Sequence, residues 1–136
     1  MIEIKNIGRF YKTDKFGNLI NECAIENVKS PFLDEIHTLQ DICQDVLPLA
    51  GFHSLYLRGS VPRGLAVPEY SDIDAFAIID NNNAICSEYQ AKVRLASLVI
   101  ERKVDFLEFT LTDLNTLAEW ELAFVMKINS LCIMGS

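Results

Sequence analysis

Residues 56–79 read YLRGSVPRGLAVPEYSDIDAFAII and contain the pattern that decides the fold. An apolar run ends at Gly59-Ser60, a loop follows, and Asp72 and Asp74 then introduce a second apolar run. Successive side chains of a strand point to opposite faces, so both aspartates are expected on one face. Two like charges on one sheet face need compensation, and carboxylates are the ligands of hard divalent cations. The pair therefore predicts a Mg²⁺ site at the beginning of a strand.

A third carboxylate, Asp105, occurs in VDFLEF, near the start of another expected strand. If this strand lies beside the strand over 72–79, Asp105 can reach the same ions. Three carboxylates can hold two metal ions about 3.5–4 Å apart, which is the arrangement used in phosphoryl and nucleotidyl transfer. The sequence therefore predicts a centre of two Mg²⁺ ions formed by Asp72, Asp74 and Asp105.

Gly59 and Ser60 are expected to bind phosphate. Glycine allows a close approach of the backbone, N–H groups at a helix start bind anions, and the Ser60 hydroxyl can donate one further hydrogen bond. Three cations lie nearby in the sequence and could contact phosphate oxygens: Arg58, Arg63 and Lys103.

Each of these motifs also has a structural explanation. Asp72 and Asp74 could cap a helix or turn, and Asp105 could be a solvated charge at a strand edge. Gly59-Ser60 could be a plain turn, and the arginines could be ordinary surface charges.

The remaining pattern predicts an α/β (α+β) fold, in which a mixed sheet is flanked by helices. We expect an N-terminal β-hairpin over 2–12 and 19–26, helices from Ser30-Pro31, over 87–102 and over 112–128, and strands over 53–58, 72–79, 104–111 and 130–134. Ser30 is the expected N-cap of the first helix, with Pro31 at its first position. Residues 1–136 are expected to form a single domain with its core over about 30–136.

Composition restricts the function. The formal net charge of -7 disfavours nucleic acid as a partner, because an acidic surface repels the phosphate backbone. No apolar run is long enough to cross a bilayer, and the first ten residues lack a signal-peptide core, so a cytoplasmic protein without membrane contact is expected. Four cysteines without CxxC spacing are expected to be reduced and buried: Cys23, Cys43, Cys86 and Cys132.

Three spaced elements together resemble the DNA polymerase β-like nucleotidyltransferase superfamily, and most of all its small bacterial nucleotidyltransferase-domain proteins and the aminoglycoside nucleotidyltransferases. The elements are Gly59-Ser60, Ser71-Asp72-Ile73-Asp74 and Val104-Asp105-Phe106. The resemblance extends over residues 53–136.

The resemblance implies Mg²⁺-dependent transfer of a nucleoside monophosphate from an NTP, with ATP as the expected donor, to the hydroxyl of an unidentified acceptor. By position, Asp72 and Asp74 would bind both metal ions. Asp105 would bind the ion on the acceptor side and help to deprotonate the acceptor. Gly59 and Ser60 would hold the triphosphate, and pyrophosphate would leave.

Two other functions remain open at this point. The first is an antitoxin, since small proteins similar to this one AMPylate a HEPN-type toxin partner. The second is a non-catalytic nucleotide-binding module. Many relatives also carry a C-terminal acceptor-binding domain, whereas this sequence stops at LCIMGS. The expectation is therefore a truncated form, a minimal family member, or a chain that needs a partner protein or a second copy.

Overall fold

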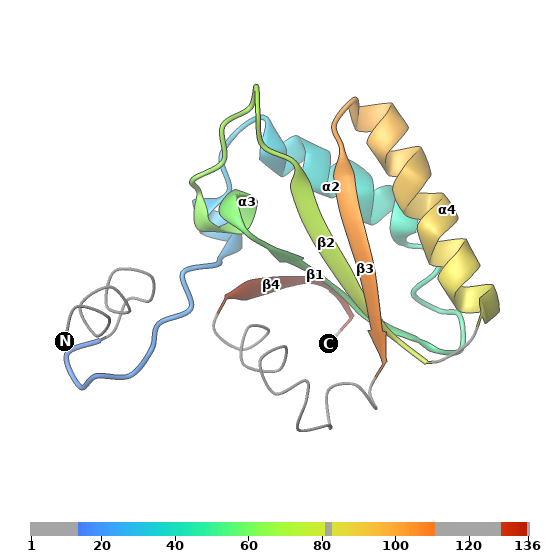
Figure 1. The fold of residues 1–136 in the computed structure, drawn as a ribbon, viewed down its shortest axis with the longest axis horizontal. Helices are drawn as coiled ribbons and strands as arrows, with labels where there is room; N and C mark the ends of the chain where they lie inside the picture. Colours follow the sequence, from blue (N-terminus) through green and yellow to red (C-terminus); the bar gives the residue numbers. More distant parts are fainter. Residues whose placement is uncertain (1–13, 81–82, 111–128, 136) are drawn as a thin grey trace.

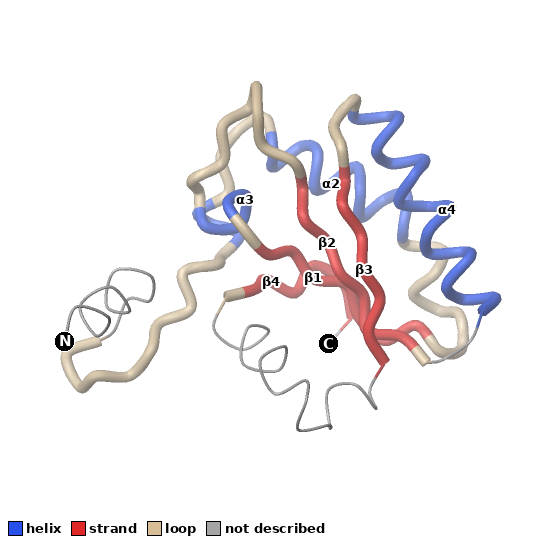
Figure 2. Tube along the Cα trace, in the orientation of Figure 1, coloured by secondary structure: helices blue, strands red, loops and turns tan. Residues whose placement is uncertain are grey.

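The computed structural model describes residues 14–80, 83–110 and 129–135 of this chain. Helices α2 and α4 lie together on one side of a four-stranded sheet (Figure 1; Figure 2). The elements in chain order are the 3-10 helix η1 (Ile25–Asn27), α2 (Phe32–Cys43), β1 (Phe52–Arg58), α3 (Ser60–Arg63), β2 (Ile73–Ile79), α4 (Asn83–Ile100), β3 (Val104–Thr110) and β4 (Ser130–Gly135).

The sheet has the strand order β3-β2-β1-β4. Strand β1 pairs antiparallel with both β2 and β4, whereas β2 and β3 are parallel and are joined by the crossover helix α4. The register places Arg58 opposite Asp74, and Asp74 opposite Asp105. The predicted mixed sheet flanked by helices is confirmed, and each predicted strand after residue 50 is present with bounds that differ by one residue.

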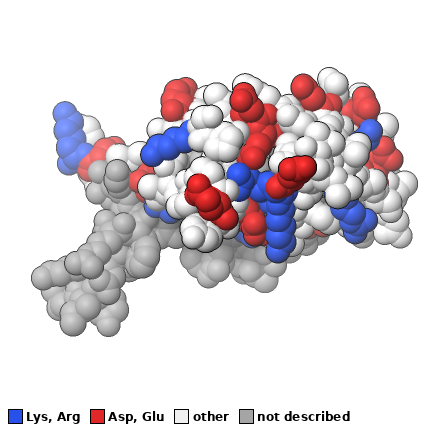
Figure 3. Space-filling model, turned by 90° about the horizontal axis from the view of Figure 1, so that it is seen from above, with Lys and Arg blue, Asp and Glu red and all other residues white. Residues whose placement is uncertain are grey.

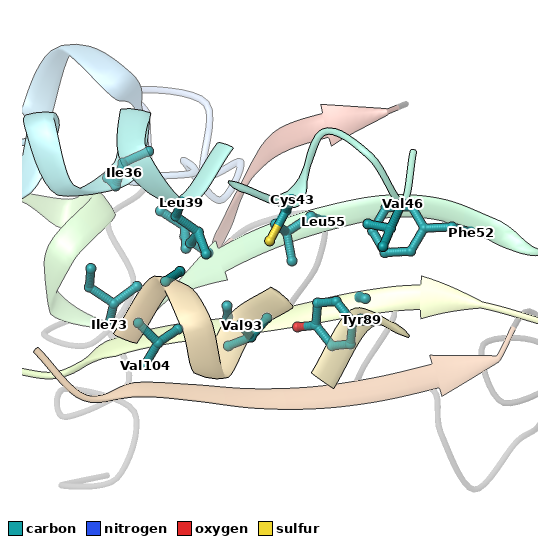
Figure 4. Close-up of a cluster of buried hydrophobic side chains, with 14 of the residues drawn as sticks. Ile36, Leu39, Cys43, Val46, Phe52, Leu55, Ile73, Tyr89, Val93 and Val104 are labelled. Atoms are coloured by element: carbon teal, nitrogen blue, oxygen red, sulfur yellow. The ribbon is translucent and has the colours of Figure 1, made fainter. Parts of the chain in front are cut away.

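The hydrophobic core lies between the sheet and helices α2 and α4 (Figure 4). From β2, the residues at odd positions enter this core, among them Ile73 and Ala75, while Tyr89 of α4 packs against them fully buried. Alternation sends Asp74 and Phe76 to the opposite face. The apolar pattern of β2 therefore determines that its carboxylate points away from the helices.

The opposite face of the sheet also holds packed aromatic side chains. The ring of Phe76 stacks on that of Tyr56 at a centroid distance of 5.1 Å and meets Phe109 edge-on at 6.0 Å. Phe76 is fully buried. Because Phe76 follows Asp74 on the same face, the carboxylate lies at the polar end of an otherwise apolar strip.

The start of helix α2 differs from the prediction. Pro31, not Ser30, is the N-cap, and the first helical residue is Phe32. With φ -87° and ψ 2°, Pro31 lies outside the helical region, and the first turn is closed by backbone bonds from Leu33 to Lys29 and from Glu35 to Pro31. Helix α4 begins at residue 83 rather than 87, because Ile85 adds a buried anchor to its first turn.

The N-terminal hairpin is not found in the part that can be assessed. Residues 2–12 lie outside the described residues, and residues 19–26 hold a single bridge residue, Leu19, before η1. The turn between the two expected strands is present, since the Asp14 carboxylate accepts hydrogen bonds from the N–H groups of Phe16 and Asn18. Local side-chain bonds of this kind compete with strand pairing. The predicted helix over 112–128 also lies outside the described residues.

All four cysteines are free thiols. Burial raises the pKa of Cys23 and of Cys43 to about 11, so both are neutral at pH 7. Cys86 is half-buried, and Cys132 is exposed on β4, so the expectation of burial was wrong for Cys132.

Within the described ranges, no helix has the length and apolar character needed to span a membrane.

Candidate active site

The candidate site begins with two carboxyl groups on neighbouring parallel strands. The β2–β3 register places Asp74 directly beside Asp105 of the neighbouring strand. Burial, the adjoining carboxyl group of Asp105 and the negative charge of Asp72 raise the pKa of Asp74, while Arg58 opposes the shift. The neutral form of Asp74 is therefore favoured more than in a freely solvated carboxyl group.

Asp72 lies immediately before β2 and on the same side as Asp74. It is close enough for its charge to raise the pKa of Asp74. In residues 14–80, 83–110 and 129–135, however, no three His, Cys, Asp or Glu side chains are arranged as a complete metal site. Asp74 and Asp105 could hold a cation between them, because they are partners in the register of two neighbouring strands. Asp72 adds negative charge without completing a three-ligand arrangement.

Gly59 forms the wall of the site next to Asp74. Its φ of +85° is a conformation that favours glycine, and a Cβ built there would lie 2.8 Å from Oδ2 of Asp74. The sequence predicted a glycine that admits phosphate, and the structure shows that the same glycine also admits a carboxylate. Ser60 begins the single turn of α3, and its carbonyl accepts a hydrogen bond from the Leu65 N–H at 2.9 Å.

Cations flank the carboxyl groups on both sides. Lys103 Nζ is 3.2 Å from Oδ1 of Asp105, and this contact raises the pKa of Lys103, with a further contribution from the charge of Asp72. Arg58 lies across from Asp74 on β1, with its guanidinium 5.8 Å from the centroid of the Phe76 ring. Lys103 and Arg58 therefore balance only part of the negative charge of these carboxyl groups.

Arg63, a predicted phosphate contact, is paired with an acidic side chain in this structure. Its Nη2 lies 3.6 Å from Oε2 of Glu22, in the segment before η1.

Figure 3 views the molecule from above and shows acidic side chains with basic ones scattered among them. The Lys and Arg side chains on that face do not form a continuous basic surface of the kind that binds a nucleic-acid backbone.

Sequence reasoning missed Arg102 and Glu35. Arg102 Nε donates to Oε2 of Glu35 at 2.7 Å, and its Nη1 donates to the carbonyls of Pro68 at 2.8 Å and Ser71 at 2.7 Å. Ser71 directly precedes Asp72. No periodicity or motif links positions 67 residues apart, so only the folded chain shows this contact.

One end of three adjacent strands carries a glycine turn, three carboxyl groups and two cations, of which Lys103 is exposed and Arg58 is partly buried. Carboxylate oxygens suit hard cations, and a glycine turn admits phosphate oxygens. The arrangement can hold a divalent cation together with a polyphosphate.

Two solved structures are similar to this chain. One is described as a toxin–antitoxin with AMP-PNP, and the other as a mutant of the toxin–antitoxin MntA-HpeT with Asp-to-Glu changes at two positions separated by one residue. In both comparisons the TM-score is 0.51 and the sequence identity is 16%, over 74% of this chain and 73% of the other. No protein-family model and no curated protein matches the chain. At this identity the likeness shows that the chain shares the fold of these structures, and it does not single out the aminoglycoside enzymes.

Proposed function

We propose that this chain is a nucleotidyltransferase that moves a nucleoside monophosphate from an NTP to an acceptor hydroxyl. The observation that carries the proposal is the register that places Asp74 beside Asp105, next to Gly59. Two carboxyl groups in contact disfavour full ionisation at neutral pH unless a cation joins them. Nucleotidyl transfer needs carboxylates that bind a divalent cation and a neighbouring turn that can bind phosphate, and this site offers groups of both kinds.

The proposed roles follow the geometry. Asp74 and Asp105 would hold Mg²⁺, with Asp72 as the third carboxylate, and two ions would be bound when the NTP is present. Bound Mg²⁺ supplies Lewis-acid polarisation of the phosphoryl oxygens and neutralises the leaving pyrophosphate. The backbone at Gly59 and the Ser60 hydroxyl would bind the triphosphate. Arg63 would contact phosphate by exchanging its partner Glu22.

The covalent step balances without another reactant. The acceptor oxygen attacks the α-phosphorus in line, the bond from that phosphorus to the bridging oxygen breaks, and pyrophosphate leaves with the electron pair. Asp105 accepts the acceptor proton, and its side chain, 46% exposed, is open to an incoming hydroxyl. Lys103 Nζ, 3.2 Å from Oδ1 of Asp105, would stay beside this carboxyl group during the transfer.

The comparisons support an adenine nucleotide and the Asp72–Asp74 pair. One similar structure contains AMP-PNP, an ATP analogue, which favours ATP as donor. The other carries two aspartate changes separated by one residue, the same spacing as Asp72 and Asp74. Since both similar structures are toxin–antitoxins, the second candidate is an antitoxin that transfers AMP to a protein partner. A non-catalytic nucleotide-binding module is the third.

The first test is thermal unfolding of the wild type with each of the four NTPs, with and without Mg²⁺. A ligand at a hundred times its Kd adds about 2.7 kcal/mol to stability, which gives a clear rise in Tm for a domain of this size. We expect a Mg²⁺-dependent rise with ATP that is lost in Asp74→Asn. The control is Asp80→Asn, which removes an aspartate at the other end of β2, paired there with His53 at 3.0 Å.

The second test uses ATP labelled at the α-phosphate. Transfer of label to a co-expressed protein would favour the antitoxin reading, and transfer to a small hydroxyl compound would favour the general enzyme. Binding without any release of pyrophosphate would support the non-catalytic module. A wild type that no NTP stabilises, with Mg²⁺ present, contradicts the proposal.

A further inference from the structure

The guanidinium of Arg102 is held in one orientation by four contacts. It is paired with Glu35, it donates to the carbonyls of Pro68 and Ser71, and it lies 4.4 Å from the centroid of the Phe32 ring. The Arg102 and Glu35 side chains are only 12% and 14% exposed. A planar guanidinium with donors in a fixed fork can make these bonds at the same time, whereas a lysine ammonium on a flexible stem cannot reproduce that fork.

The segment that Arg102 holds is the closed turn over 67–71. The Ser71 N–H and the Tyr70 N–H both donate to the Val67 carbonyl, at 2.8 and 3.0 Å. The Ser71 hydroxyl in turn accepts from the Val67 N–H at 2.8 Å. Arg102 joins this turn to helix α2 through Glu35. The last residue of the turn is therefore tied to the body of the protein immediately before Asp72.

The backbone is tied on the other side of Asp72 as well. The Ile73 N–H donates to the carbonyl of Lys103 at 3.0 Å. Thus Arg102 holds the residue before Asp72, and Lys103 holds the residue after it. The same stretch continues into β3 and presents Asp105. Residues 102–105 therefore place Asp72 and Asp105 relative to one another.

Arg102 is itself placed by the end of helix α4. Glu101 adopts a left-handed φ of 56°, which ends the helix and turns the chain toward β3. The Ser97 hydroxyl donates to the Arg102 carbonyl at 2.7 Å, and the Arg102 N–H donates to the Ser97 carbonyl at 3.3 Å. Both the backbone and the side chain of Arg102 are fixed, as a residue that positions another must be.

We propose that Arg102 is a positioning residue that sets the place of Asp72 relative to Asp74 and Asp105. This inference rests on the proposed function, because it concerns the cation-binding carboxylates of that site. Asp74 and Asp105 lie within strands, where the ladder holds them, whereas Asp72 precedes its strand and depends on the turn. Loss of the Arg102 bonds should therefore weaken cation binding while leaving the Gly59-Ser60 turn in place.

The test compares Arg102→Lys with Arg94→Lys. Arg94 belongs to helix α4, which ends shortly before Arg102, and its guanidinium lies 5.6 Å from the centroid of the Phe106 ring. This control therefore makes the same chemical change away from the turn. Hydrogen exchange is measured at the Ser71 and Ile73 amides, and the Mg²⁺ midpoint is measured for stabilisation by ATP. We expect Arg102→Lys to speed exchange at both amides about tenfold and to raise the Mg²⁺ midpoint about tenfold, as loss of an outer-shell partner does. Arg94→Lys should do neither.

Steady-state kinetics provide a third measurement. Arg102→Lys should lower kcat at fixed Mg²⁺ more than it raises the KM for ATP, and excess Mg²⁺ should restore part of kcat. If Arg102→Lys does not fold, Glu35→Gln serves instead, because it leaves the arginine and both carbonyls in place while removing the ion pair. We expect the same changes in the same direction, but smaller.

A lower Tm with unchanged amide exchange and an unchanged Mg²⁺ midpoint would overturn the proposal and leave Arg102 as a core ion pair only. Faster exchange with an unchanged midpoint would overturn it as well. If the wild type shows no Mg²⁺-dependent nucleotide binding, the proposed function fails. The exchange measurement on the ligand-free protein then still decides whether Arg102 holds the turn before Asp72.

Discussion

Glu35 and the Asp74–Asp105 pair are acidic groups of the same fold that differ in their charge partners. The Glu35 side chain is only 14% exposed and is paired with Arg102 at 2.7 Å. Asp74 instead lies against Asp105, and the nearby cation Lys103 is 69% exposed. The chain can thus pair a carboxylate internally where the structure needs it. Carboxyl groups left in contact at strand ends indicate a place for a cation from outside, as perturbed groups at functional sites often do.

The largest expected effect breaks the internally paired carboxylate. Arg102→Ala should lower the free energy of unfolding by about 3–5 kcal/mol, because it leaves the Glu35 charge buried without a partner. Urea unfolding measures the loss. The double variant Glu35→Ala/Arg102→Ala should lose less than the sum of the two single variants, since the two side chains contact each other. Additive losses would show that the pair is not coupled.

The second prediction separates the backbone of Gly59 from its contact with Asp74. Gly59 and Gly17 both have φ +85°, but a Cβ at Gly17 meets nothing within 4 Å, whereas one at Gly59 meets the Asp74 carboxylate. Alanine at either position should cost about 1–3 kcal/mol of stability, because a positive φ is strained for a residue with a Cβ. Only Gly59→Ala should also displace the Asp74 carboxylate and abolish stabilisation by ATP and Mg²⁺. Equal nucleotide binding by the two variants would count against Gly59 as part of the site.

The third prediction concerns the cost of the carboxyl pair itself. In the absence of metal, Asp74→Asn should raise stability at pH 7 by at most about 1 kcal/mol, because it removes a like-charge contact that is partly screened by solvent. The folded-state pKa of Asp74 lies above its ordinary value of 3.8. The folded protein therefore binds the Asp74 proton more tightly than the unfolded chain does. The contribution of this proton to the free energy of unfolding is fully present below pH 3.8 and is lost as pH rises through the raised pKa.

The direction of this pKa shift can be tested by thermal unfolding. The Tm of Asp74→Asn relative to the Tm of the wild type should increase as pH rises from below 4 toward neutrality. Mg²⁺ should reduce this difference in Tm, because it stabilises only the wild type. Parallel Tm profiles for the two proteins across this range would show that Asp74 and Asp105 do not interact in solution.

The smallest effect is expected at the exposed ion pair. Lys103 and Asp105 are 69% and 46% exposed, so Lys103→Ala should leave the stability of the fold almost unchanged. Thermal unfolding at low and high salt checks this expectation, and any small difference in Tm should shrink further at high salt. A loss as large as that of Arg102→Ala would mean that the fold, and not the site, depends on this pair.

The sequence was sufficient for the features that repeat over a few residues. Alternation around Asp72 and Asp74 predicted the strand and the common face of the two carboxylates, and the Gly59-Ser60 pattern predicted the turn. These patterns are local, because strand and helix periods are set by backbone geometry. Local signals were less reliable at element ends. The expected Ser30 cap failed, and so did the strand over 19–26, where turn and 3-10 bonds satisfy the backbone instead.

The tertiary structure alone determines which distant residues meet. Contacts between different parts of the chain include the parallel register that brings Asp105 beside Asp74, the ion pair of Arg63 with Glu22, and the bonds from Arg102 to Glu35 and Ser71. Residues far apart in the chain meet only when the core packs β2, β3, α2 and α4 together, and many sequences share the local periods without sharing that packing. The amino-acid pattern therefore determined the kinds of groups at the site, and the packed core determined their distances.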